Sequence, residues 1–199
     1  MVLKASDKGL ATLGATNLTN KKREDLDFYS TPEIATKELM KIIDFNDTTV
    51  LEPACGTLAI SKVLEKYTNA NIINKDIVAR IDGIQEEDFL LSSNDEKYDM
   101  IVTNPPFKYC QEFVIKALGK ATKKVAMLMK IQFLEGQKRY DKIHKVTPPT
   151  EVHIFTYRLP YLRGDSVQET SSAMCLCWFI WDKETMKNEY DTKIKFIGK

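Results

Sequence analysis

The stretch DMIVTNPPF, residues 99–107, joins a short apolar strand to a loop that contains two successive prolines. Each proline fixes its own φ angle, and Pro105 also restricts Asn104 to extended geometry. The loop is therefore rigid, and secondary structure does not consume all of its oxygen acceptors. An apolar strand that ends in such a loop is typical of a buried sheet with chemistry at the strand end.

Short apolar strands alternate with helices on both sides of this stretch, which predicts a parallel sheet covered on both faces. We expect strands at 49–51, 71–74, near Ile84, 99–103 and 125–129, and helices at 32–43, 58–67, 111–119 and 132–145. Two further strands, 151–157 and 174–181, close the chain. The expected fold is α/β, with a mostly parallel seven-stranded sheet and helices on both faces.

Length and composition predict one domain. The chain has 199 residues, 43% of them apolar, and a net charge of +1, which neither demands nor excludes a polyanionic partner. Residues 1–27 are polar and aperiodic and are expected to form a tail or arm, leaving residues 28–199 as a single catalytic domain. The longest apolar run has nine residues, 173–181, and the polar start resembles no signal peptide, so we expect a cytoplasmic protein with no membrane segment.

The candidate ligand residues stand where strands end, as ligands of doubly wound sheets require. Glu52-Pro53-Ala54-Cys55-Gly56 leaves the first strand; its small residues let backbone N–H groups approach a ligand, and Glu52 can accept from a cationic amine. Asp76, about 20 residues on, suits the hydroxyls of a ribose. Asp88-Phe89 suits a purine, with a carboxylate for its amino group and a ring for its face.

The Asn104 loop suits the methylation of an amine. The Asn104 side-chain oxygen and the Pro105 carbonyl can both accept from one amino group and draw its lone pair towards a methyl donor. Phe107 offers a ring that can stack on a planar substrate.

These motifs resemble those of the class I, Rossmann-like amino-methyltransferases, in particular the DNA adenine methyltransferases. Asn104-Pro105-Pro106-Phe107 is similar to the family's catalytic motif, residues 52–56 to its cofactor loop, and Phe28-Tyr29-Ser30-Thr31-Pro32 to the motif that wraps the methionine end of the cofactor. The resemblance implies a Rossmann-like sheet that closes with a C-terminal hairpin whose last strand is reversed. It also implies S-adenosylmethionine as cofactor and the exocyclic N6 amine of adenine in DNA as acceptor. It implies a catalytic role for Asn104, Pro105, Pro106 and Phe107, and cofactor binding by Tyr29, Thr31, Pro32, Glu52, Pro53, Ala54, Cys55, Gly56, Asp76, Asp88, Phe89 and Asn104.

The chain departs from the family in two ways. Leu58 stands where the cofactor loop usually has a second glycine, and neither the segment 56–104 nor the tail after Lys145 has room for a large target-recognition region. We therefore expect sequence specificity that is loose, that covers a short recognition site, or that is supplied by a partner or a second copy. The alternatives are an RNA base amine, the glutamine of release factors, or a catalytically silent subunit that binds nucleic acid or a partner.

Basic residues near these motifs are candidates for the nucleic-acid backbone, with DNA preferred over RNA: Lys108, Arg139, Lys142, Arg158 and Arg163. No metal site is expected. Cys175 and Cys177 share a strand face but lack a second ligand pair, and the four cysteines are expected to be reduced. The alternation around His153 predicts an outward-facing strand residue.

Overall fold

The computed structural model describes residues 29–163, 166–171, 174–187 and 191–199. The expected N-terminal tail, residues 1–27, and Phe28 of the third motif lie outside the described residues. None of the helices described is long and apolar enough to cross a membrane.

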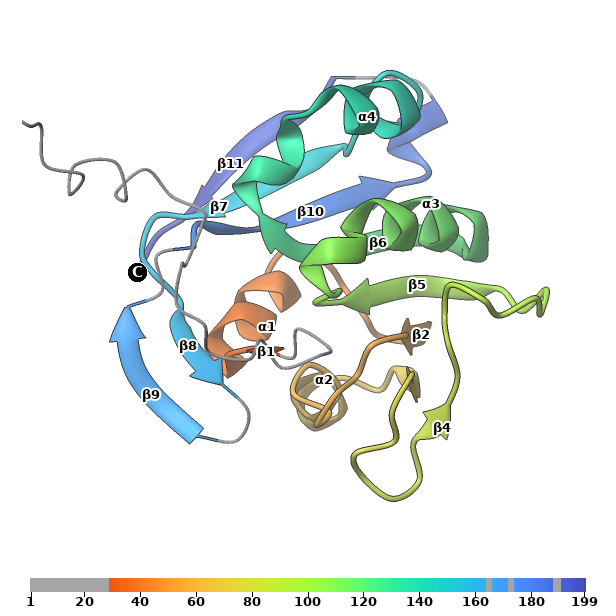
Figure 1. The fold of residues 1–199 in the computed structure, drawn as a ribbon, viewed down its shortest axis with the longest axis vertical. Helices are drawn as coiled ribbons and strands as arrows, with labels where there is room; N and C mark the ends of the chain where they lie inside the picture. The colour runs from red at the N-terminus through yellow and green to blue at the C-terminus, as the bar shows by residue number, and fades with distance from the viewer. Residues whose placement is uncertain (1–28, 164–165, 172–173, 188–190) are drawn as a thin grey trace, which may run out of the picture.

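The main sheet has eight strands in the order β11-β7-β10-β6-β5-β2-β3-β4 (Figure 1). Neighbouring strands from β4 to β6 run parallel, and β10 runs antiparallel to both β6 and β7. The α/β, Rossmann-like prediction with its reversed hairpin is confirmed. The strands of this sheet are β2 (Thr49–Glu52), β3 (Asn71–Asp76), β4 (Gln85–Glu86), β5 (Tyr98–Thr103), β6 (Ala121–Lys130), β7 (Glu151–Phe155), β10 (Leu176–Asp182) and β11 (Lys193–Ile197).

The predicted number of seven strands was wrong, because β11 adds a parallel edge strand beyond β7. Its sequence, KIKFI, alternates lysine with apolar residues and carries no turn signal that separates it from the polar C-terminal segment. His153 of β7 pairs with Lys195 of β11 and is only 4% exposed, so the outward-facing prediction for His153 was wrong too.

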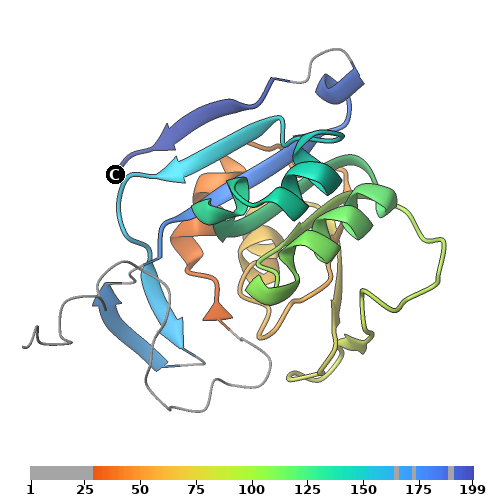
Figure 2. The same ribbon diagram turned by 45° about the horizontal axis from the view of Figure 1, so that its top comes forward.

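Helices cover both faces of the sheet (Figures 1 and 2). α1 (Glu33–Met40) and α2 (Ser61–Tyr67) pack on one face over a cluster that includes Val50, Leu128 and Trp178. α3 (Cys110–Lys120) and the segment around α4 (Gln137–Arg139) cover the other face, over a cluster that includes Ile101, Met127 and Phe179. The central strands β5, β6 and β10 are therefore buried on both sides, which explains their nearly continuous apolar runs.

The predicted helix at 132–145 is broken into three pieces. A 3-10 turn, Ile131–Leu134, precedes α4, and a π-helical turn, Tyr140–His144, follows it. Gly136, with a φ of 104°, ends the first turn in a conformation that side chains rarely adopt. The helical period over this stretch could not reveal the interruption.

A second, three-stranded antiparallel sheet was not predicted. It consists of β1 (Tyr29–Ser30), β8 (Pro160–Arg163) and β9 (Ser166–Ser171), with β8 in the middle. The β8–β9 hairpin is inserted between β7 and β10, and its pairing with β1 places it beside the start of α1 (Figure 1).

Candidate active site

A cavity of about 400 Å³ opens at the carboxyl ends of β2, β3 and β5. Parallel strands end at the same edge of a sheet, so residues far apart in sequence meet there. The predicted site residues that line the cavity are Thr31, Glu52, Pro53, Ala54, Cys55, Gly56, Asp76, Asp88, Phe89, Asn104, Pro105, Pro106 and Lys108. Of the other predicted cofactor and catalytic residues, Pro32 and Phe107 do not line it, and the side chain of Tyr29 lies outside the described residues.

The loop after β2 keeps the path of a glycine-rich turn although it lacks the second glycine. Gly56 has a φ of 53° and Leu58 a φ of 65°, and the Leu58 N–H donates to the Cys55 carbonyl at 2.7 Å. A left-handed conformation costs a side-chain-bearing residue roughly 1–2 kcal/mol. The loop therefore reaches the expected geometry with strain at Leu58.

Glu52 is buried at the bottom of the cavity, with 3% of its surface exposed. Burial raises the pKa of its carboxyl to about 8 despite the hydrogen bonds from Ser61. The Ser61 N–H lies 3.1 Å from Oε2, and the Ser61 hydroxyl contacts both this oxygen and the Asn74 side-chain oxygen.

Asp76, at the end of β3, already holds the loop after β2. Its Oδ2 accepts from the Gly56 N–H at 2.8 Å, and its Oδ1 accepts from the Val78 N–H at 3.0 Å and from Arg80 at 3.2 Å. A carboxylate offers about four acceptor positions. The second lone pair of Oδ2 therefore remains for a ligand hydroxyl, beside the Arg80 guanidinium.

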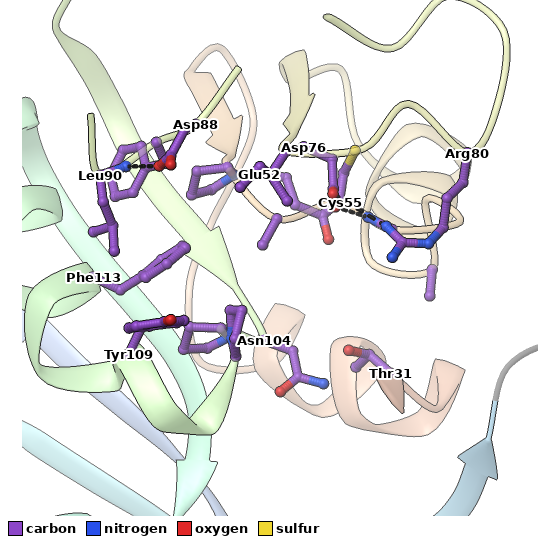
Figure 3. A pocket seen from close by; sticks show the side chains of 18 of the residues that line it. Thr31, Glu52, Cys55, Asp76, Arg80, Asp88, Leu90, Asn104, Tyr109 and Phe113 are labelled. Carbon is purple, nitrogen blue, oxygen red and sulfur yellow. Dashed lines mark hydrogen bonds and ion pairs between the residues drawn. The ribbon is translucent and has the colours of Figure 1, made fainter. Parts of the chain in front are cut away.

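Asp88 lies on the side of the cavity away from Arg80 (Figure 3), and the next residue, Phe89, also lines the cavity. Asp88 Oδ1 accepts from the N–H groups of Leu90 (2.8 Å) and Leu91 (3.2 Å), which leaves Oδ2 for an amino group. Phe89 is 3% exposed, and its ring centroid lies 5.2 Å from that of Phe113 in α3. This side has a carboxylate beside aromatic walls, as a purine requires.

The loop after β5, residues 104–107, forms one wall of the cavity, here called the partition. Asn104, Pro105 and Pro106 line the cavity, and a 3-10 turn, Phe107–Tyr109, follows them, closed by a bond from the Tyr109 N–H to the Pro106 carbonyl at 2.8 Å. The Phe107 ring packs against the core on the α3 side and lies outside the cavity lining. The Nζ of Lys130 is 4.4 Å from the centroid of this ring.

The third predicted motif reaches the cavity through its middle residues. Ser30 and the buried Thr31 line it, whereas Pro32 is buried outside it at the start of α1. Tyr29 pairs with Arg163 through the backbone, and the side chains of both lie outside the described residues.

Three of the predicted nucleic-acid residues are exposed and lie on separate segments: Lys108 lines the cavity, Arg158 lies between β7 and β8, and Lys142 lies on the turn after α4. Arg139 is half-buried, and its guanidinium donates to the carbonyls of Glu135 (2.6 Å) and Gln132 (3.2 Å). These bonds tie the loop before α4 together.

Sequence reasoning missed several lining residues, among them Arg80, Leu90, Tyr109 and Phe113. Tyr109 and Phe113 follow the catalytic motif by two and six residues, so the aromatic positions of the next turn were the available signal. Arg80 stands four residues after Asp76 but in a loop, where spacing predicts no contact.

The described part of the chain contains no disulfide and no cluster of metal-ligating side chains. All four cysteines are free thiols, and burial raises the pKa of Cys55, which lines the cavity, to about 12. In the described ranges, no three His, Cys, Asp or Glu side chains gather closely enough to hold a metal ion.

The sequence is similar to a type II methyltransferase, M.CvrRI, of Paramecium bursaria Chlorella virus XZ-6E, with 37% identity over 101 residues. The match covers 45% of this chain and 27% of the relative, so this chain spans about a quarter of the relative it matches. No family model matches the sequence.

Three solved structures share the fold. A protein of Pyrococcus horikoshii assigned as an RNA methyltransferase has a TM-score of 0.61 at 16% identity, covering 79% of this chain and 87% of that one. A modification subunit assigned to a type I restriction enzyme of Vibrio vulnificus has a TM-score of 0.57 at 13% identity, covering 86% and 47%. A dimethyladenosine transferase of Plasmodium falciparum has a TM-score of 0.56 at 15% identity, covering 81% and 66%. The fold is thus the α/β fold of class I methyltransferases.

Three polar features line the cavity: Asp88 Oδ2 beside aromatic rings, the Asp76 carboxylate, and the buried Glu52 beside the backbone of residues 53–56. Their chemistry suits a ligand that combines a planar base with an amino group, sugar hydroxyls and a cationic amine.

We expect replacement of Leu58 to separate side-chain packing from backbone strain. Leu58→Ala and Leu58→Gly both delete the half-buried side chain, but only glycine adopts a φ of 65° freely. Although glycine loses more entropy on folding, the glycine variant should be more stable by roughly 1 kcal/mol in urea unfolding. Equal stability, or a more stable alanine variant, would contradict the strained loop.

The buried carboxyl of Glu52 predicts a pH-dependent stability. Because its pKa rises from an ordinary 4.5 to about 8 in the folded protein, its stabilising protonation is complete below 4.5 and is lost as the pH approaches 8. Glu52→Gln keeps the acceptor for Ser61 but does not ionise. Relative to this variant, the wild type should lose stability in urea between about pH 5 and pH 8. A constant difference across this range would mean that Glu52 is ionised throughout.

Proposed function

We propose that the chain is an S-adenosylmethionine-dependent methyltransferase that methylates a base amine in nucleic acid, with N6 of adenine in DNA as its substrate. The observation that carries this proposal is the arrangement of residues 104–107. Asn104 and both prolines line the cavity, whereas Phe107 does not line it and packs against the core. A methyl donor and a planar acceptor can then approach one pair of fixed oxygens from two sides.

The residues of the cavity would hold the cofactor in three parts: Asp88 and Phe89 at the adenine, Asp76 at the ribose, and Glu52, Gly56 and Thr31 at the amino acid end. When bound, S-adenosylmethionine supplies an activated methyl group that passes to an amine nitrogen, while the amine gives up a proton to solvent.

The protein's own contribution is positioning. The Asn104 side-chain oxygen and the Pro105 carbonyl accept the two amine hydrogens, which orients the nitrogen lone pair towards the cavity. The prolines hold both acceptors in place before the substrate arrives. Stacking on the Phe107 ring would offset part of the cost of taking the base out of a duplex.

DNA is favoured over RNA by the relative at 37% identity, which is a type II methyltransferase. Recognition of a DNA sequence needs elements outside the catalytic fold, and the described part of the chain contains no large region beyond its sheets and helices. The β8–β9 hairpin is the inserted element nearest the site, since it pairs with the strand that carries Ser30. We propose that this hairpin, together with a specificity partner or a second copy of the chain, recognises the DNA sequence around the target adenine.

A catalytically silent binding subunit is the main alternative. It would have no use for paired acceptors at the rim of a cofactor-sized cavity, and this chain keeps all four residues of that loop. Methylation of a release-factor glutamine is disfavoured by Phe107, where those enzymes usually have tyrosine.

Asn104→Ala should abolish methyl transfer while leaving cofactor binding nearly intact. It removes one of two acceptors that act on the amine, and losing a preorganised catalytic partner typically lowers the rate by on the order of 10²-fold or more. Transfer of labelled methyl to DNA and calorimetric binding of S-adenosylmethionine, measured on the same preparation, check this.

Asn104→Asp is the matched control, since it retains an acceptor oxygen of the same reach and should keep measurable activity. An Asn104→Ala variant that folds and transfers methyl groups at the wild-type rate would remove Asn104 from the mechanism.

A further inference from the structure

Two lysines lie over the aromatic rings of the 3-10 turn Phe107–Tyr109. Lys108 Nζ is 5.1 Å from the ring centroid of Tyr109, and Lys130 Nζ is 4.4 Å from that of Phe107. Lys108 belongs to the turn itself, whereas Lys130 is the last residue of β6. The turn thus has one ammonium group from within and one from the neighbouring strand.

Neither lysine is neutralised in the described part of the chain. Elsewhere, lysines that are at least half-buried bind fixed oxygens: Lys75 binds Glu87 and Glu96, Lys116 the carbonyls of Leu90 and Ser92, and Lys124 the Asp182 carboxylate. Lys130 is half-buried too, but its ammonium meets only the face of Phe107 within the described residues. A partly desolvated cation without a carboxylate is left to attract an anion from outside.

The position of Lys130 places that anion on the substrate side of the partition. Neither Lys130 nor Phe107 lines the cavity, and the Phe107 ring, which also packs against the core, has the Lys130 ammonium over it. A base that stacks on the face of the ring under Lys130 must move the lysine, whose long flexible stem can carry the ammonium a short way outward.

We infer that Lys130 is a substrate-positioning residue that covers Phe107 in the free protein and binds a backbone phosphate next to the target base once that base is in place. This inference rests on the proposed function, and it adds a residue that no motif of the sequence indicated for this role. Stacking of the base on Phe107 is then coupled to binding of the DNA backbone, because the Lys130 ammonium leaves the ring when a phosphate is close enough to bind it.

Lys130→Gln tests the inference by binding and by kinetics. With S-adenosylhomocysteine present, anisotropy of a fluorescein-labelled adenine-containing DNA should show several-fold weaker binding, and the slope of log affinity against log salt should fall by about 0.7–0.9, the share of one phosphate contact. KM for DNA should rise in parallel, with kcat at saturation and cofactor affinity close to wild type. Lys130→Arg should restore the salt slope.

Lys123→Gln is the matched control, because Lys123 is an exposed lysine at the opposite end of the same strand. It should leave DNA affinity and its salt slope unchanged. A Lys130→Gln variant with the wild-type slope overturns the inference, and if its kcat or thermal stability falls instead, Lys130 serves only to pack on Phe107. Failure of the proposed function is separate: the wild type would then bind DNA with or without the Lys130 contribution but transfer no methyl group.

Discussion

The rest of the site depends on the parallel alignment of β2, β3 and β5, which places three loops at one edge of the sheet. Leu51 pairs with Ile73 on one side and with Ile101 on the other, so the residues just beyond these strands are brought side by side. Glu52, Asp76 and Asn104, separated by up to 52 positions in sequence, thereby border one cavity.

The same burial sets the electrostatics of the site. Glu52 is held in a place where its charged form is unfavourable, because burial outweighs the hydrogen bonds from Ser61, which favour the ionised form. An ammonium group arriving beside it would favour the ionised form. The free protein thus avoids a buried charge that the cofactor would compensate. Asp76, in contrast, has partners within the protein: it accepts from the N–H groups of Gly56 and Val78 and pairs with Arg80.

Much of the fold and most of the lining residues followed from the sequence, because strand ends and motif spacing are local signals. The remainder depends on contacts that local patterns do not encode. The edge strand β11 and the β8–β9 hairpin are short and polar, and only pairing with distant strands makes them strands. The left-handed Leu58 could be suspected from the missing glycine, but only the structure showed that the loop accepts the strain. The position of Phe107 outside the cavity depends on the turn that follows the prolines, as does the contact with Lys130.

The most direct test of this account is transfer of labelled methyl from S-adenosylmethionine to unmethylated DNA, total RNA and protein in parallel, followed by nucleoside analysis of the products. The account predicts N6-methyladenine in DNA. A methylated base in RNA alone would keep the chemistry and change the substrate. Absence of transfer to all three, with measurable cofactor binding, would contradict the account and leave a subunit that binds without catalysing.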